Sequence, residues 1–129
     1  MLYDAIIMSV IVISVVDDMF FASKIRAVAE AAGVEISFPR SQEAVVSKAR
    51  ETKPGLIVVD LHNQKIDPVA LARELKADDE LRGVKLLGFF SHVQIELQRN
   101  ALAAGFDQVI PRSVFARDLP EILAADERG

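Results

Sequence analysis

The chain has 129 residues, of which 51% are apolar and 26% charged, and its formal net charge is −4. This length and composition predict one globular domain over 1–129 with a single core. The absence of cysteine excludes disulfides, thiol nucleophiles and cysteine-ligated metals, and an acidic chain without a Lys/Arg-rich run argues against nucleic-acid binding.

The first third of the chain carries its most apolar stretch, from Ala5 to Val16. This stretch is too short to span a bilayer, and no basic residue precedes it as in a signal peptide. We therefore expect no membrane association and a cytoplasmic location. Met1 and Met8 are both candidate start sites, because a complete strand begins only after Met8.

Short β-branched runs alternate with segments of helical period. In chain order, the predicted elements are a strand over 10–16, a helix that Gly33 ends, a strand over 34–38, a helix over 41–50, a strand over 56–60, a helix that Asp67 caps, a strand over 84–90, a helix over 93–104 that Gly105 ends, a strand over 108–110 and a helix over 118–126. Ser41 and Asp67-Pro68 are typical helix starts, and Asp118 with Glu121 resembles a capping box. The four phenylalanines Phe20, Phe21, Phe89 and Phe90 are expected in the core.

Strict alternation with short connections predicts parallel strands joined by right-handed crossovers, with helices on both faces of the sheet. The fold class is therefore α/β, a three-layer, doubly wound five-stranded sheet of the flavodoxin-like order 2-1-3-4-5. Ligands of such sheets bind at the carboxyl ends of the strands, beside the first and third strands.

Polar side chains follow the strands at that edge of the predicted sheet. Asp17 and Asp18 follow the first strand, Asp60 ends the third, Ser91 follows the fourth and Arg112 follows the fifth. Three crowded carboxylates repel one another unless a proton or a cation intervenes. Mg²⁺ is the expected cation, because it prefers oxygen ligands and binds beside phosphoryl groups.

Four segments together resemble the receiver domain of bacterial two-component response regulators: VVDD at 15–18, LIVVD at 56–60, FFS at 89–91 and AAGFDQVIPR at 103–112. The resemblance covers nearly the whole chain. It implies that Asp60 accepts a phosphoryl group, that Asp17 and Asp18 bind the metal with Asp60, and that the backbone carbonyl of His62 completes the coordination. Ser91 matches the hydroxyl that follows the arriving phosphoryl group.

The resemblance also implies partners. The donor would be a histidine kinase or a phosphotransfer protein, and a stand-alone receiver would signal by binding a downstream protein. The family docks such proteins on the face of the fourth helix, fifth strand and fifth helix, here around Phe106, Gln108 and Ala116.

Several positions depart from the family pattern, and three of them bear on the predicted function. Arg112 stands where the family has lysine, His92 replaces a small residue and either crowds or contacts the phosphoryl site, and Val109 replaces the switch aromatic. The alternative is therefore a pseudo-receiver that binds partners without phosphorylation.

Plainer interpretations stand beside these. Asp17 and Asp18 would stabilise a helix start as capping residues, Asp60 would be a turn residue, and the two histidines would pack in loops. A third function, a small flavodoxin-like enzyme or cofactor module, is disfavoured because no Gly-rich phosphate loop occurs.

Overall fold

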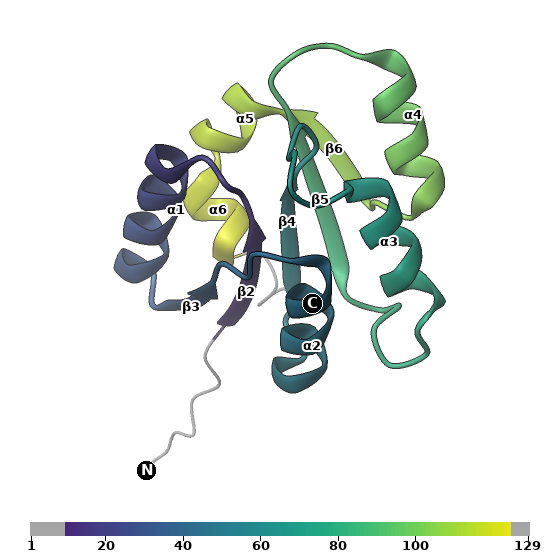
Figure 1. Cartoon of the computed structure of the whole chain (residues 1–129). Coiled ribbons are helices and arrows are strands. Elements are labelled where there is room, and N and C mark those ends of the chain that lie inside the picture. The colour runs from purple at the N-terminus through teal and green to yellow at the C-terminus, as the bar shows by residue number, and fades with distance from the viewer. Residues whose placement is uncertain (1–9, 125–129) are drawn as a thin grey trace.

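The computed structural model describes residues 10–124, which form five strands and six helices (Figure 1). The strands are β2 (Val10–Val15), β3 (Val34–Ser37), β4 (Leu56–Asp60), β5 (Lys85–Phe90) and β6 (Gln108–Pro111). The helices are α1 (Met19–Ala31), α2 (Gln42–Thr52), α3 (Pro68–Ala77), α4 (Ile95–Ala104), α5 (Arg112–Arg117) and α6 (Leu119–Ala124). The candidate starts Met1 and Met8 lie outside the described residues, as does the end of the predicted last helix.

The strands form one parallel sheet in the order β3-β2-β4-β5-β6. This is the predicted order 2-1-3-4-5, and the α/β fold class is confirmed. Val15 pairs with Val59, and Asp60 pairs with Phe89. Because the ends of β2, β4 and β5 are aligned in the parallel register, the loops that follow these strands start side by side at one edge of the sheet.

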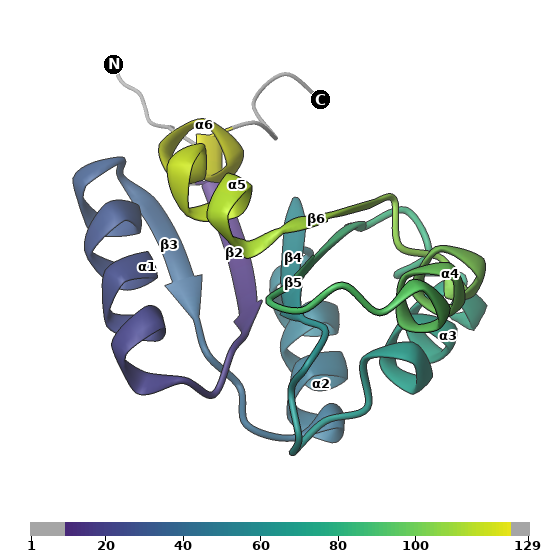
Figure 2. The ribbon, with the colours of Figure 1, turned by 90° about the horizontal axis from the view of Figure 1, so that it is seen from above.

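Helices cover both faces of the sheet, with α1, α5 and α6 on one face and α2, α3 and α4 on the other (Figure 2). Side chains alternate along each strand, so β2 places Val12 toward the first group and Ile13 toward the second. Both residues are fully buried. The apolar character of the strands on both faces therefore follows from the two helix layers.

Local sequence signals set several helix ends as predicted. The Ser41 hydroxyl accepts a hydrogen bond from the Ala44 N–H, and the Asp67 carboxylate accepts from Val69 and Ala70 at the start of α3. Gly33 follows α1 with a φ of +72°, a left-handed conformation in which glycine avoids the strain of a side chain.

The predicted last helix is confirmed as α6, which begins at Leu119 directly after Asp118, but the sequence analysis missed α5, a short helix that begins at Arg112 directly after β6. Asp118 lies between the two helices, and its carboxylate accepts hydrogen bonds from the Arg117 guanidinium. Burial stabilises both helices, since the side chains of Phe115 from α5 and Leu119 from α6 are inaccessible to solvent.

Phe20 was predicted in the core, and this is also wrong because its side chain is 92% exposed. Phe20 and Phe21 are neighbours in the first turn of α1, and adjacent residues of a helix point about 100° apart. Only Phe21 faces the sheet and is buried. Within residues 10–124, no helix has both the length and the apolar character needed to cross a membrane.

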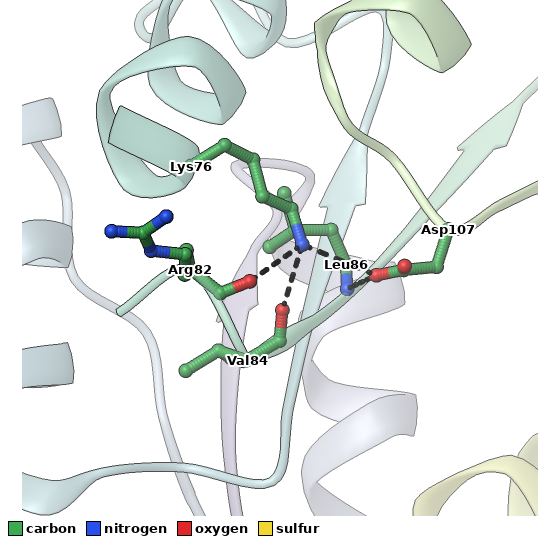
Figure 3. A network of polar contacts seen from close by, with 5 residues as sticks. All are labelled: Lys76, Arg82, Val84, Leu86 and Asp107. Atoms are coloured by element: carbon green, nitrogen blue, oxygen red, sulfur yellow. Dashed lines mark hydrogen bonds and ion pairs between the residues drawn. The ribbon is translucent and has the colours of Figure 1, made fainter. Parts of the chain in front are cut away.

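Replacing Gly105 at the end of α4 is expected to destabilise the fold. Gly105 has a φ of +124°, and a Cβ there would lie 2.5 Å from Cγ of Lys76. The Lys76 ammonium donates to the carbonyls of Arg82 and Val84 and pairs with Asp107 at 3.6 Å (Figure 3). Gly105→Ala therefore strains the backbone and displaces this lysine, and we expect the free energy of unfolding to fall by about 2 kcal/mol in urea titrations.

Gly83→Ala is the matched control for this change. Gly83 has an ordinary φ, and no atom lies within 4 Å of where its Cβ would be. We expect its effect to stay within about 0.5 kcal/mol. Equal stability of the two variants would contradict the strain assigned to Gly105.

Candidate functional site

The predicted site residues lie at or just after the ends of four strands, β2, β4, β5 and β6, at the carboxyl edge of the sheet (Figure 1). Asp17 and Asp18 connect β2 to α1, Asp60 is the last residue of β4, Ser91 follows β5 and Arg112 begins α5. The parallel register explains this placement, because every strand delivers its last residue to the same edge.

Asp60 is a buried carboxylate with few compensating contacts. Asp60 is only 8% exposed to solvent. Its Oδ1 accepts a hydrogen bond of 2.8 Å from the His62 N–H. Within residues 10–124, no lysine, arginine or histidine lies within ion-pair distance of this carboxylate. Burial raises the pKa of Asp60, and the negative charge of Asp17 adds to the rise, whereas the His62 N–H and the charges of His62 and Arg112 act against it.

Asp18 has a different environment, because its two oxygens have different partners. Oδ1 accepts from the Phe21 N–H at 3.1 Å and caps α1, and Oδ2 lies 3.5 Å from Nη2 of Arg112. The Phe21 N–H and, after it, the Arg112 guanidinium hold the pKa of the Asp18 carboxyl below its usual value. The capping role of Asp18 is confirmed.

Arg112 is fixed by two contacts with the start of α1. Besides the ion pair with Asp18, its guanidinium carbon lies 4.0 Å from the centre of the Phe21 ring. This distance is typical of a cation–π contact. The sequence analysis placed Arg112 at the acidic edge. It did not predict that the guanidinium stacks on the Phe21 ring, because this contact depends on α5 packing beside α1.

His62 and His92 contact each other above the ends of β4 and β5. Their rings meet edge to face with centroids 5.5 Å apart, and the His92 N–H donates to Nε2 of His62 at 3.4 Å. Asn63 was missed as a contributor: its amide donates to the Val15 carbonyl at 3.4 Å, and its Oδ1 accepts from Lys65 and Ile66. Asn in a turn after a strand is a local signal for such backbone bonding.

Asp17 lines a cavity at the surface. This cavity has a volume of about 210 Å³, with Asn63 and the cations Arg26, Arg40 and Lys65 in its lining. A larger cavity, of about 680 Å³, includes Lys53 and Lys85 in its lining, at the opposite ends of the strands, away from the predicted site.

The donor set at this edge fits Mg²⁺ in its chemistry, but Arg112 contacts one of the donors. Carboxylate oxygens of Asp17, Asp18 and Asp60 are the ligands that a hard divalent cation prefers. Within the described residues, however, no three acidic or histidine side chains are gathered as tightly as a preformed metal site requires. Oδ2 of Asp18, one of these candidate donor atoms, lies 3.5 Å from Nη2 of Arg112.

The predicted partner-binding face needs one correction. Phe106 is 4% exposed and packs in the core beneath α3 and α4, so it is not available to a partner. Gln108 is exposed, Ala116 is partly exposed, and Val109 packs partly against the same core as Phe106. Phe106 is drawn inward because it fills the space beside Gly88, where a Cβ would lie 3.2 Å from its ring.

Comparison with known proteins adds a sequence relative. No family model matches the chain. The response regulator protein VraR of Staphylococcus aureus is 32% identical over 89 residues, which are 69% of this chain and 42% of that protein. The chain thus spans less than half the length of this relative.

Solved structures share the fold over almost the whole chain. They include the phosphorylated cyanobacterial phytochrome response regulator RcpA (17% identity, TM-score 0.77, 93% of this chain and 92% of that chain). A CheY-like receiver domain protein from Methanospirillum hungatei (20%, 0.77, 94% and 98%) and the chemotaxis response regulator CheY4 of Vibrio cholerae (13%, 0.78, 92% and 99%) are equally similar. The chain therefore has the fold of these response-regulator receiver domains, and over 89 residues its sequence is similar to that of VraR.

Proposed function

We propose that this domain accepts a phosphoryl group on the Asp60 carboxylate and signals by binding a partner protein. One observation carries the proposal: within residues 10–124, Asp60 is the only charged residue that is buried, and it ends the central strand β4. A buried, unpaired carboxylate destabilises a fold, so its presence at the ligand-binding edge favours a functional role.

The transfer would be a nucleophilic substitution at phosphorus. Oδ1 of Asp60 is engaged by the His62 N–H, which leaves Oδ2 as the attacking oxygen. A P–O bond forms to Oδ2 while the bond from phosphorus to the donor breaks, and the donor atom leaves with the bonding electron pair. For a histidine kinase or a phosphotransfer protein, the donor atom is an imidazole nitrogen, and the product is an acyl phosphate.

Mg²⁺ is part of the proposal. Its candidate ligands are the carboxylates of Asp17, Asp18 and Asp60 and the backbone carbonyl of His62, and it would offset the charge on the phosphoryl oxygens. The Ser91 hydroxyl is the candidate hydrogen-bond donor to the bound phosphoryl group. Arg112 would provide a second cation there, since one guanidinium group can donate hydrogen bonds to two phosphoryl oxygens at once.

A second candidate function is partner binding without phosphorylation. It is favoured by the contact of Arg112 with Asp18, which closes part of the metal site, and by the position of His92 against His62. A cytoplasmic location and the absence of nucleic-acid and membrane binding remain predictions under both functions.

Incubation with acetyl phosphate and Mg²⁺, followed by intact mass measurement, tests the proposal. We expect one phosphoryl adduct on the wild-type chain and none on Asp60→Asn, because the amide is not a nucleophile. Asp79→Asn makes the same change at an exposed carboxylate and should keep the adduct. A folded wild-type chain without an adduct, or an adduct on Asp60→Asn, would overturn the assignment; the first outcome favours the second candidate function.

A further inference from the structure

We propose that the guanidinium of Arg112 and a divalent cation compete for the carboxylate of Asp18, so that metal binding and the Arg112–Asp18 contact exclude each other. The inference rests on the metal site of the proposed function and adds a regulatory residue to it. It follows from three features of the structure: the engagement of both Asp18 oxygens, the platform beneath Arg112, and the charge at the edge of the sheet.

Both oxygens of Asp18 are in use. Oδ1 accepts from the Phe21 N–H and holds the first turn of α1, so the other oxygen is the one open to a cation. That oxygen, Oδ2, lies 3.5 Å from Nη2 of Arg112. A divalent ion on Oδ2 would lie next to the guanidinium, and the two like charges would repel each other. Binding of the ion is therefore expected to displace the guanidinium.

The position of Arg112 is specific because its platform is rigid. Phe21 is buried and meets the ring of Phe89 at 5.4 Å and the ring of Phe115 at 5.9 Å, both edge to face. The guanidinium lies over this fixed ring at 4.0 Å. A planar guanidinium stacks on an aromatic face more readily than the compact, strongly hydrated ammonium of lysine. Arginine at this position thus favours the contact with Asp18.

The contact is nevertheless weak enough to exchange. The side chains of Arg112 and Asp18 are 36% and 40% exposed, and ion pairs in contact with solvent contribute little because water screens them. The edge also keeps the negative charges of Asp17 and Asp60, which attract a divalent cation more strongly than a monovalent one. Mg²⁺ at sufficient concentration should therefore displace Arg112, and by linkage Arg112 lowers the affinity for Mg²⁺ by the same factor.

Titration with Mg²⁺ alone, without a phosphoryl donor, tests the inference. Backbone amide NMR signals at Asp18 and Asp60 give the affinity of wild type, Arg112→Ala and Arg117→Ala. We expect Arg112→Ala to bind Mg²⁺ about tenfold more tightly than wild type, because the competing charge is gone. Arg117→Ala is the matched control: it removes an arginine of the same helix that pairs with Asp118, so its affinity should equal that of wild type.

A second readout follows Arg112 itself. Its side-chain protons lie over the Phe21 ring, so the ring current should move their signals upfield in the metal-free protein. Saturating Mg²⁺ should return them toward the values of a free arginine, whereas the Arg117 signals stay in place. Circular dichroism of each variant checks that it is folded.

Equal or weaker Mg²⁺ affinity in Arg112→Ala, no Mg²⁺ binding in any variant, or unchanged Arg112 signals at saturation would each overturn the inference. Its failure is separable from that of the proposed function. A chain that takes up a phosphoryl group but shows equal affinities refutes only the competition. A chain that shows competition but no adduct refutes only the role of Asp60 as acceptor.

Discussion

Phe115→Ala is expected to lower the free energy of unfolding by about 4 kcal/mol. Phe115 is fully buried, stacks on Phe89 with ring centroids 4.7 Å apart, and meets Phe21 edge to face. Truncation removes the transfer free energy of the ring and leaves a cavity between two aromatic neighbours that cannot close it. Urea unfolding followed by circular dichroism measures the change.

Phe20→Ala is the matched control for this truncation. It removes the same atoms from a side chain that is 92% exposed, and the expected change is within about 0.5 kcal/mol. A Phe115→Ala variant as stable as Phe20→Ala would contradict the packing of α5 against β5. The three phenylalanines that contact one another, Phe21, Phe89 and Phe115, also contact the site, because the Arg112 guanidinium lies over the Phe21 ring.

Asp60→Asn is expected to raise the free energy of unfolding near pH 7 by about 1 kcal/mol, with partial solvent screening taken into account. Burial raises the pKa of Asp60, which means that the folded state disfavours the charged form. An amide keeps an oxygen that can accept from the His62 N–H but carries no charge. It also removes the repulsion by Asp17.

The sign of the pH dependence follows from the raised pKa of Asp60. Near neutral pH the folded state holds a carboxylate that it disfavours, and this destabilisation is lost as the pH falls through the folded pKa, where the carboxyl takes up a proton. The stability advantage of Asp60→Asn should therefore be full near neutral pH and shrink in acid. Urea titrations of both chains from about pH 7 to about pH 4 measure it.

Asp118→Asn is the control of opposite sign. The Arg117 guanidinium holds the pKa of the Asp118 carboxyl below its usual value, so the folded state favours the charged form there. Removing that charge should not raise the free energy of unfolding at neutral pH. If Asp60→Asn is destabilised near pH 7, or if its advantage grows in acid, the unfavourable charge assigned to Asp60 is wrong.

An unfavourable charge at Asp60 is consistent with the proposed role as acceptor. The Arg112 guanidinium contacts Asp18, so it does not pair with the Asp60 carboxylate. Functional groups held in this way commonly reduce stability, and replacing them commonly raises it. The stability and phosphorylation measurements on Asp60→Asn therefore examine the same property from two sides.

The helix starts that were predicted correctly depend on contacts between residues close in the sequence. The starts of α2 and α3 at Ser41 and Asp67 were predicted because a cap is a contact between residues three positions apart. The start of α6 after Asp118 was also predicted, but α5 was not, because its Phe115 is held by stacking on Phe89 of distant β5. The inward position of Phe106 beside Gly88 depends on packing in the same way.

The sequence by itself determined the α/β class, the order of the strands and the edge at which Asp17, Asp18, Asp60, Ser91 and Arg112 meet. Periodicity and short connections leave few topologies, and parallel strands end at one edge. Only the tertiary structure decided that Arg112 pairs with Asp18 and stacks on Phe21. These partners are more than ninety positions apart, and only the packing of α5 against α1 and β5 brings them together.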